Sequence, residues 1–229
     1  MRRPTVLIFA KSPQIGIAKT RLAAGLGSPV LARRIASMMQ ARTIRAALAG
    51  HWRAILYTAP DKALARNGLW PARLERRSQG QGDLTARLNK GLAEAPVGPV
   101  LFIGADAPDI SPALIRKAIR LLQNHDAVFG PAADGGFWLF GLHKTARTKS
   151  PFHNVRWSGP HAMEDVWAQL PEHASIGLLP QLIDVDDEND WESWQIKHEH
   201  EVEELIEAQE HPTPPPEKKR GLFARLFGK

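Results

Sequence analysis

Short apolar runs alternate with helical patterns along the first 185 residues, and this alternation limits the fold more than any other feature of the sequence. The run TVLIFA at residues 5–10 is typical of a strand buried on both faces of a parallel sheet. Helices are expected at residues 28–49, 83–94, 111–123, 159–170 and 188–209, and strands at residues 5–10, 53–58, 100–104, 127–130, 137–140 and 182–185. This order of elements predicts a doubly wound α/β sheet.

Length and composition predict one domain of ordinary size. The chain has 229 residues, of which 43% are hydrophobic, enough for a single core. We expect a domain at residues 1–210, followed by a Pro-rich linker and a short basic amphipathic tail at residues 211–229. The sequence has no cysteine, which excludes disulfides and thiolate catalysis.

No segment has the pattern of a membrane span or a secretion signal, so we expect a cytoplasmic protein. The tail adds a separate hypothesis. Large apolar side chains stand among basic residues at 221–229, which favours weak contact with an anionic membrane or with a groove on a partner protein. The protein would then be peripheral at the inner face of the membrane. A tail without structure is the alternative.

The formal net charge is +6, although acidic side chains are concentrated at residues 184–210. The basic remainder suits an anionic substrate such as a nucleotide, and a solvated basic surface is the alternative. No recognition motif for DNA or RNA is present, so nucleic acid is not an expected partner.

The loop after the first predicted strand, KSPQIGIAKTRL, is a candidate phosphate site. Lys11, Lys19 and Arg21 supply three cations, and Gly16 allows a close backbone turn. Arginine can bind phosphate oxygens in a bidentate manner, whereas lysine acts as a point charge. The spacing differs from that of a Walker loop. An exposed basic loop is the other interpretation.

Asp106 follows the apolar run at residues 100–104, at the end of a strand where α/β proteins bind ligands. Mg²⁺ in proteins takes one or two carboxylates and completes its shell with water and substrate phosphates. The sequence therefore predicts a metal site at Asp106. Either Asp184 or Asp186, which follow the last predicted strand, could supply a second ligand.

The segment Asp134-Gly135-Gly136 lies between two predicted strands. It is typical of a hairpin turn, and it could also form an acceptor pocket in which Asp134 receives a hydroxyl group. Trp157 is a possible wall of such a pocket, although a place in the core or at its rim is equally compatible with the sequence.

Five ordered blocks resemble a known family: FAKSPQIGIAKTRLAAGLG, QGQGDLTARLNKGL, FIGADAPDISPALI, VFGPAADGGFWLFGL and VRWSGPHAMEDV. They resemble a bacterial family of uncharacterised transferases that is commonly labelled glycosyltransferase, with one branch tied to arsenosugar biosynthesis. More distantly, the layout resembles the molybdenum-cofactor and phospholactate guanylyltransferases. The resemblance implies a three-layer α/β fold with a doubly wound mixed sheet, of the nucleotide-diphosphosugar transferase (glycosyltransferase-A) type.

The resemblance also implies roles for individual residues. Those that would bind the nucleotide and its phosphates are Lys11, Gly16, Lys19, Arg21, Gly82 and Asp83. Those that would shape the acceptor site are Asp134, Gly135 and Gly136, and Phe137 and Trp157 are further candidates for contact with the acceptor. Asp106 and Asp134 would be catalytic, and Asp106 and Asp186 would hold Mg²⁺ or Mn²⁺.

The resemblance implies a metal-dependent glycosyltransferase that uses a nucleotide sugar and a small-molecule acceptor. The first alternative is a nucleotidyltransferase, which would join an NTP to a phosphorylated small molecule and release pyrophosphate. The cationic loop suits this alternative better, because a triphosphate carries more charge, and the family label favours the glycosyltransferase. The second alternative is a non-catalytic nucleotide-fold module that recruits partners.

Overall fold

The computed structural model describes residues 2–65 and 68–210. The predicted tail at residues 211–229, and the membrane or partner contact predicted for it, lie outside the described residues. The chain divides into two compact units, Met1–Glu192 and Ser193–Lys229. The helix α6 (Glu188–Glu210) begins in the first unit and ends in the second.

A seven-stranded mixed sheet forms the middle of the first unit, in the order β3-β2-β1-β4-β6-β5-β7. Its strands are β1 (Thr5–Lys11), β2 (Arg53–Ala59), β3 (Glu75–Ser78), β4 (Gly98–Gly104), β5 (Ala127–Pro131), β6 (Phe137–Lys144) and β7 (Ile176–Leu178). Strand β6 is antiparallel to both β4 and β5, and the other neighbours are parallel. The carboxyl ends of β1 and β4 and the β5–β6 turn therefore lie at the same edge of the sheet.

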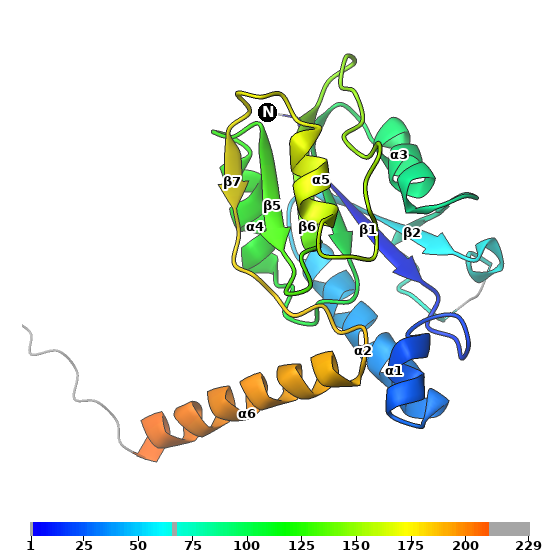
Figure 1. Cartoon of the computed structure of the whole chain (residues 1–229), viewed down its shortest axis with the longest axis vertical. Coiled ribbons are helices and arrows are strands. Elements are labelled where there is room, and N and C mark those ends of the chain that lie inside the picture. Colours follow the sequence, from blue (N-terminus) through cyan, green and yellow to red (C-terminus); the bar gives the residue numbers. More distant parts are fainter. Residues whose placement is uncertain (1, 66–67, 211–229) are drawn as a thin grey trace, which may run out of the picture. The chain divides into compact units, whose positions relative to one another are not determined.

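Helices cover both faces of the sheet and create three layers (Figure 1). One core contains side chains from α2 (Pro29–Ala47) and α4 (Pro112–Leu121), and the other contains side chains from α3 (Leu84–Glu94) and α5 (Ala162–Ala168). Successive residues of β1 alternate between these cores, because neighbouring side chains of a strand point to opposite faces. The continuous apolar run is thereby explained, and the predicted fold class is confirmed.

The sequence signals for helix starts act as expected. Ser28, Asp83 and Ser111 each cap a helix, because their side chains accept a hydrogen bond from a backbone N–H in the first turn. Proline occupies the first position of both α2 and α4. The helix predicted at residues 188–209 is present as α6.

Several elements differ from the prediction. The strand expected at residues 182–185 is wrong, because only Leu182 forms an isolated bridge, to Ala132. The strand at this edge of the sheet is β7, which lies earlier in the chain. The short elements α1 (Thr20–Gly25), η1 (Asp61–Ala63) and β3 were not predicted. Strand β3 has the sequence ERRS, which carries no apolar pattern.

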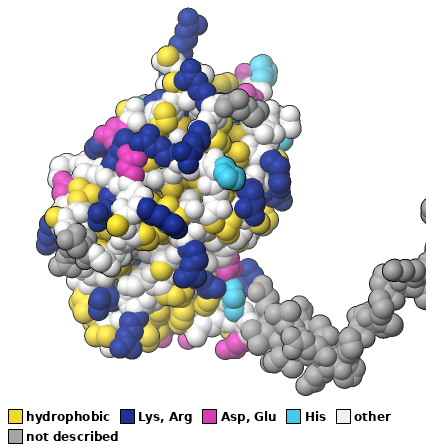
Figure 2. Space-filling model, turned by 180° about the vertical axis from the view of Figure 1, so that it is seen from behind, with side chains coloured by type: hydrophobic (Ala, Val, Ile, Leu, Met, Phe, Trp, Pro, Cys, Tyr) yellow, Lys and Arg dark blue, Asp and Glu magenta, His cyan; other side chains and the backbone are white. Residues whose placement is uncertain are grey.

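Basic side chains are spread over the face seen in Figure 2, with apolar and acidic groups between them. Among residues 2–65 and 68–210, none of the helices combines the length and the apolar character that crossing a bilayer requires.

Candidate active site

The loop after β1 directs Lys19 toward the middle of the sheet edge. Gln40 holds the start of this loop, because its Nε2 donates to the carbonyl oxygen of Lys11 at 2.6 Å. Lys19 has a left-handed backbone, with φ of 54°, and immediately precedes α1. Its side chain is only 5% exposed. A buried lysine needs partners of opposite charge, so its surroundings identify the centre of the site.

Three carboxylates form a cluster at this edge. Asp106 follows β4, and the segment that carries Asp184 and Asp186 runs beside it, held by a hydrogen bond of 3.0 Å from the Val185 N–H to the Asp106 carbonyl oxygen. Val185 is fully buried, and the side chains on either side of it in an extended chain point to the opposite face. One carboxylate oxygen from each aspartate lies within 4.8 Å of the others.

Lys19 bridges two members of the cluster. Its Nζ lies 2.7 Å from Oδ1 of Asp106 and 2.6 Å from Oδ1 of Asp186. Arg21 reaches the other oxygen of Asp186, Oδ2, at 2.6 Å, but its side chain is 66% exposed. Only the lysine side of the Lys19 pairs is buried, since Asp106 and Asp186 are 43% and 35% exposed, whereas both members of the Arg21 pair are in contact with water.

The pKa values show that the cluster attracts cations. Burial disfavours the charged form of Lys19, but Asp106, Asp186 and Asp184 outweigh burial and raise its pKa above the usual value. Burial and then the charge of Asp106 raise the pKa of Asp184 to about 8. Burial opposes the ionisation of Asp186, yet Lys19 and Arg21 hold its pKa below the usual range. Lys19 therefore offsets only part of the negative charge in the cluster.

The residues present fit a divalent metal. Three carboxylates form a hard oxygen ligand set of the kind that Mg²⁺ and Mn²⁺ prefer. The Lys19 ammonium lies between Asp106 and Asp186 and pairs with both. The two carboxylates therefore already stabilise one cation. Among the described residues, this is the group whose carboxylates come together with suitable spacing.

A cavity of about 510 Å³ lies on one side of the cluster and is called the donor cavity below. Its lining includes five of the predicted nucleotide-binding residues, namely Lys11, Lys19, Arg21, Gly82 and Asp83. Asp106 and Asp186 lie at its end, and Arg87 supplies a further cation. The start of α3 also faces this cavity, and the partial positive charge of a helix N-terminus favours anions.

A second cavity, of about 230 Å³, lies on the other side of the cluster and is called the acceptor cavity below. Its lining includes Asp134, Gly136, Phe137 and Trp157, four of the residues predicted at the acceptor side. Asp186 and Ser158 line both cavities. The two spaces therefore meet at the acidic cluster.

Asp134 is both a turn residue and a cavity residue. Its Oδ1 accepts a hydrogen bond of 2.9 Å from the Gly136 N–H, which fixes the β5–β6 turn. The side chain lines the acceptor cavity and its charge acts on Asp184. The second carboxylate oxygen, Oδ2, is thus available to a ligand.

Two predicted site residues, Gly16 and Gly135, line neither cavity. Both have a positive φ, 77° and 86°, which favours glycine. A Cβ at Gly135 would lie 2.3 Å from the carbonyl oxygen of Pro160, whereas a Cβ at Gly16 would meet nothing within 4 Å. Gly135 is therefore needed for close approach of the turn to the backbone before α5.

We expect Gly135→Ala to lower the free energy of unfolding by more than ~2 kcal/mol, because a left-handed backbone costs about 1–2 kcal/mol and a backbone clash adds to it. Gly16→Ala is the matched control, since it has the strained backbone without the clash. Urea unfolding of both variants measures the difference. Equal losses would show that the turn moves away from Pro160 at no cost.

The sequence prediction left one metal ligand open and missed Arg87, which lines the donor cavity. Asp184 was one of two open choices for a second ligand, and the structure places both with Asp106. Arg87 was not singled out. Its Nη1 donates to Oε1 of Gln79 at 3.2 Å and its Nε to the Gly82 carbonyl oxygen at 3.1 Å, so it is held at the donor cavity. Its place in the block QGQGDLTARLNKGL was the available signal.

Solved structures of transferases are similar to this chain in overall fold. A solved structure from Desulfovibrio desulfuricans G20, described as a candidate nucleotide-diphospho-sugar transferase, is 26% identical, with a TM-score of 0.71 over 82% of this chain and 84% of its own. A nucleotidyl transferase from Methanothermobacter thermautotroptrophicus is 17% identical, with a TM-score of 0.57 over 83% of this chain and 95% of its own.

A third structure, Rv0371c from Mycobacterium tuberculosis H37Rv in complex with manganese, is 14% identical, with a TM-score of 0.51 over 84% of this chain and 97% of its own. At such low identity, the last two likenesses concern the fold alone. No curated protein matches the sequence. A family model does match residues 42–159, which is more than half of the chain. The chain therefore belongs to the family described as "Uncharacterized protein conserved in bacteria (DUF2064)".

Proposed function

We propose that this protein is a nucleotide-dependent transferase, and specifically a metal-dependent glycosyltransferase that uses a nucleotide-sugar donor. The observation that carries the proposal is the position of the acidic cluster, where the donor cavity meets the acceptor cavity. The likeness to a candidate nucleotide-diphospho-sugar transferase supports the donor class. The resemblance to the arsenosugar-biosynthesis branch remains a prediction within this proposal.

The donor cavity suits a nucleoside diphosphate group. Lys11, Arg21 and Arg87 line it, and arginine side chains can bind two phosphate oxygens at once. Gly82, with φ of 93°, precedes the Asp83 cap of α3, so backbone N–H groups at the helix start are directed to the same space. Positioning and charge stabilisation of this kind are the main sources of catalysis in such transfers.

The residues that would hold the metal are Asp106, Asp184 and Asp186. A bound Mg²⁺ or Mn²⁺ supplies positive charge for the diphosphate that leaves. Lys19 lies against the same carboxylates, so it can exchange one of them for a phosphate oxygen when the donor binds.

In the proposed reaction, an acceptor hydroxyl attacks the anomeric carbon of the donor sugar. A new carbon–oxygen bond forms, the bond between that carbon and the diphosphate breaks, and the nucleoside diphosphate leaves with the electron pair. Oδ2 of Asp134 accepts the hydroxyl proton, because Oδ1 is engaged by the Gly136 N–H.

Nucleotidyl transfer is the second candidate, because the donor cavity holds several cations and a triphosphate carries more negative charge than a diphosphate sugar. In that reaction the acceptor attacks the α-phosphorus of an NTP, and pyrophosphate leaves. The likeness in fold to a nucleotidyl transferase is compatible with it. A non-catalytic module is disfavoured, because such a module has no need of a buried lysine among three carboxylates.

A thermal-shift panel tests the proposal. NTPs and UDP-, GDP-, ADP- and dTDP-sugars are compared with and without Mg²⁺ or Mn²⁺. We expect one nucleotide sugar to stabilise the protein only with metal, by about 2.7 kcal/mol at ~100 times its dissociation constant. Asp106→Asn should lose this effect.

Glu172→Gln is the matched control, since Glu172 is an exposed carboxylate that lines neither cavity. It should respond as the wild type does. Stabilisation by NTPs alone would favour nucleotidyl transfer. If no nucleotide stabilises the protein under any condition, the transferase proposal fails.

A further inference from the structure

We infer that the acceptor is an uncharged alcohol with an apolar or ring-shaped face, and that the acceptor cavity excludes phosphorylated acceptors. The role of this cavity as the acceptor site rests on the proposed function. Its selectivity for uncharged ligands over phosphorylated ones rests on the lining of the cavity alone. If correct, the inference also counts against nucleotidyl transfer to a phosphorylated small molecule.

Five aromatic rings line the cavity. The rings that line it are those of Phe9, Phe102, Phe137, Trp138 and Trp157. Burial of such rings against an apolar ligand face is favourable, and ring pairs prefer offset or edge-on contact. At about 230 Å³ the cavity is smaller than the roughly 300–1,000 Å³ of pockets for drug-sized ligands. A small ring or short chain fits this space.

The ionisable side chains that line the cavity are all carboxyl groups. Asp134, Asp184 and Asp186 line it, and no Lys, Arg or His among the described residues does so. A phosphate or carboxylate on the acceptor would lose its water there without gaining a positive side chain of the cavity wall, and burying an anion without such a partner is costly. A hydroxyl group can instead donate a hydrogen bond to Asp134.

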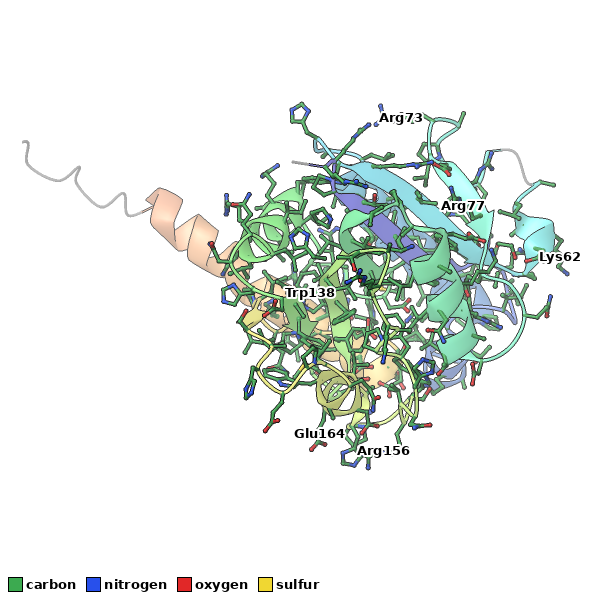
Figure 3. All side chains as sticks on the ribbon, turned by 90° about the horizontal axis from the view of Figure 1, so that it is seen from above. Lys62, Arg73, Arg77, Trp138, Arg156 and Glu164 are labelled. Carbon is green, nitrogen blue, oxygen red and sulfur yellow. The ribbon has the colours of Figure 1, made fainter. Side chains whose placement is uncertain are left out.

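Two basic side chains near Trp157 in the sequence are engaged elsewhere. Arg156 adjoins Trp157, but its guanidinium forms a bidentate pair with Asp165, with Nη2 to Oδ1 at 2.7 Å and Nε to Oδ2 at 2.9 Å. Its side chain is 61% exposed, and Figure 3 shows it at the periphery near Glu164, away from Trp138. His161 pairs with Glu164 at 3.3 Å. Neither residue lines the cavity.

The aromatic wall is already ordered before a ligand binds. The indole Nε1 of Trp157 donates to Oγ1 of Thr85 at 2.8 Å, which ties the wall to α3. The ring of Phe137 lies 5.8 Å from that of Phe129 and 6.2 Å from that of Trp157, both edge-on. A preorganised wall loses little conformational entropy on binding, so it selects for ligand shape.

Ligand-observed saturation-transfer NMR on the full chain tests the inference with benzyl alcohol and benzyl phosphate. Mg²⁺ and excess inorganic pyrophosphate are present, so that the cations of the donor cavity are occupied. We expect benzyl alcohol to bind with at least ~10-fold higher affinity than benzyl phosphate. Trp157→Ala should weaken alcohol binding, whereas Glu172→Gln, at an exposed carboxylate that lines neither cavity, should leave it unchanged.

Leu84→Lys tests the inference in the opposite direction, because it should raise the affinity for benzyl phosphate. Leu84 is 40% exposed and lines both cavities, so a lysine there adds a cation without disturbing the core. This variant should bind benzyl phosphate more tightly than the wild type does. The inference is overturned if wild-type protein binds benzyl phosphate as tightly as the alcohol and Trp157→Ala abolishes both signals.

The outcome is independent of the nucleotide panel. If nucleotides stabilise the protein but benzyl alcohol does not bind, the inference fails and the proposed function stands. If benzyl alcohol binds selectively but no nucleotide stabilises the protein, the proposed function fails while the selectivity of the cavity stands.

Discussion

Lys19→Met is expected to lower the free energy of unfolding of the metal-free protein by about 1–3 kcal/mol. Lys19 is 5% exposed, but its partners Asp106 and Asp186 are 43% and 35% exposed, so the cost lies between that of an exposed ion pair and that of a fully buried one. Methionine keeps most of the length of the side chain, so the loss reflects charge rather than volume. Urea unfolding in EDTA measures it.

Arg21→Met is the matched control. Arg21 pairs with the same residue, Asp186, but its side chain is 66% exposed, and exposed pairs contribute about 0–1 kcal/mol. We further expect Mg²⁺ or Mn²⁺ to stabilise Lys19→Met more than it stabilises the wild type, because the metal replaces the lost positive charge. If both variants lose the same small amount, the cluster does not depend on Lys19.

Asp184→Asn is expected to lower the rate of transfer about a thousandfold without lowering the stability of the metal-free protein. A metal contributes several kcal/mol to a charged transition state, and each 1.36 kcal/mol is tenfold in rate. Asparagine has the same shape and is uncharged, and burial and then Asp106 already raise the pKa of Asp184 to about 8, so its carboxyl is mostly protonated in the metal-free protein near neutral pH. Loss of activity and unchanged or higher stability are therefore expected together.

Isothermal titration with Mn²⁺ measures the metal affinity of the variant. Turnover with the donor found in the thermal-shift panel measures the rate of transfer, and urea unfolding measures stability. Glu172→Gln again serves as the control and should leave all three unchanged. Should Asp184→Asn bind Mn²⁺ and turn over as the wild type does, only Asp106 and Asp186 hold the metal. A large loss of stability would instead show that Asp184 is needed for folding.

Local patterns were sufficient to predict most of the sheet and its helices. The apolar run of β1 and the capping residues Ser28, Asp83 and Ser111 have the structural roles expected of them. Strand β3 escaped prediction because an edge strand with the sequence ERRS has no apolar alternation. Residues 182–185 were wrongly predicted as a strand, because their apolar side chains are buried beyond the end of the β5–β7 pairing rather than within it.

The site was only partly predictable, because its contacts join distant parts of the chain. Strand ends indicated Asp106 and the loop that carries Lys19, since ligands of α/β proteins bind at such ends. The pairing of Lys19 with Asp186 spans 167 positions, and no local pattern could show it. The choice between Asp184 and Asp186 likewise depended on the hydrogen bond from Val185 to Asp106, which brings both carboxylates to the cluster.

The antiparallel strand β6 has a consequence for how this protein can diversify. It brings the β5–β6 turn to the edge where β1 and β4 end, so the acceptor wall draws on a hairpin, residues 127–144, that contributes nothing to the lining of the donor cavity. Substitutions in this hairpin can therefore change which molecule is modified while leaving the phosphate contacts intact.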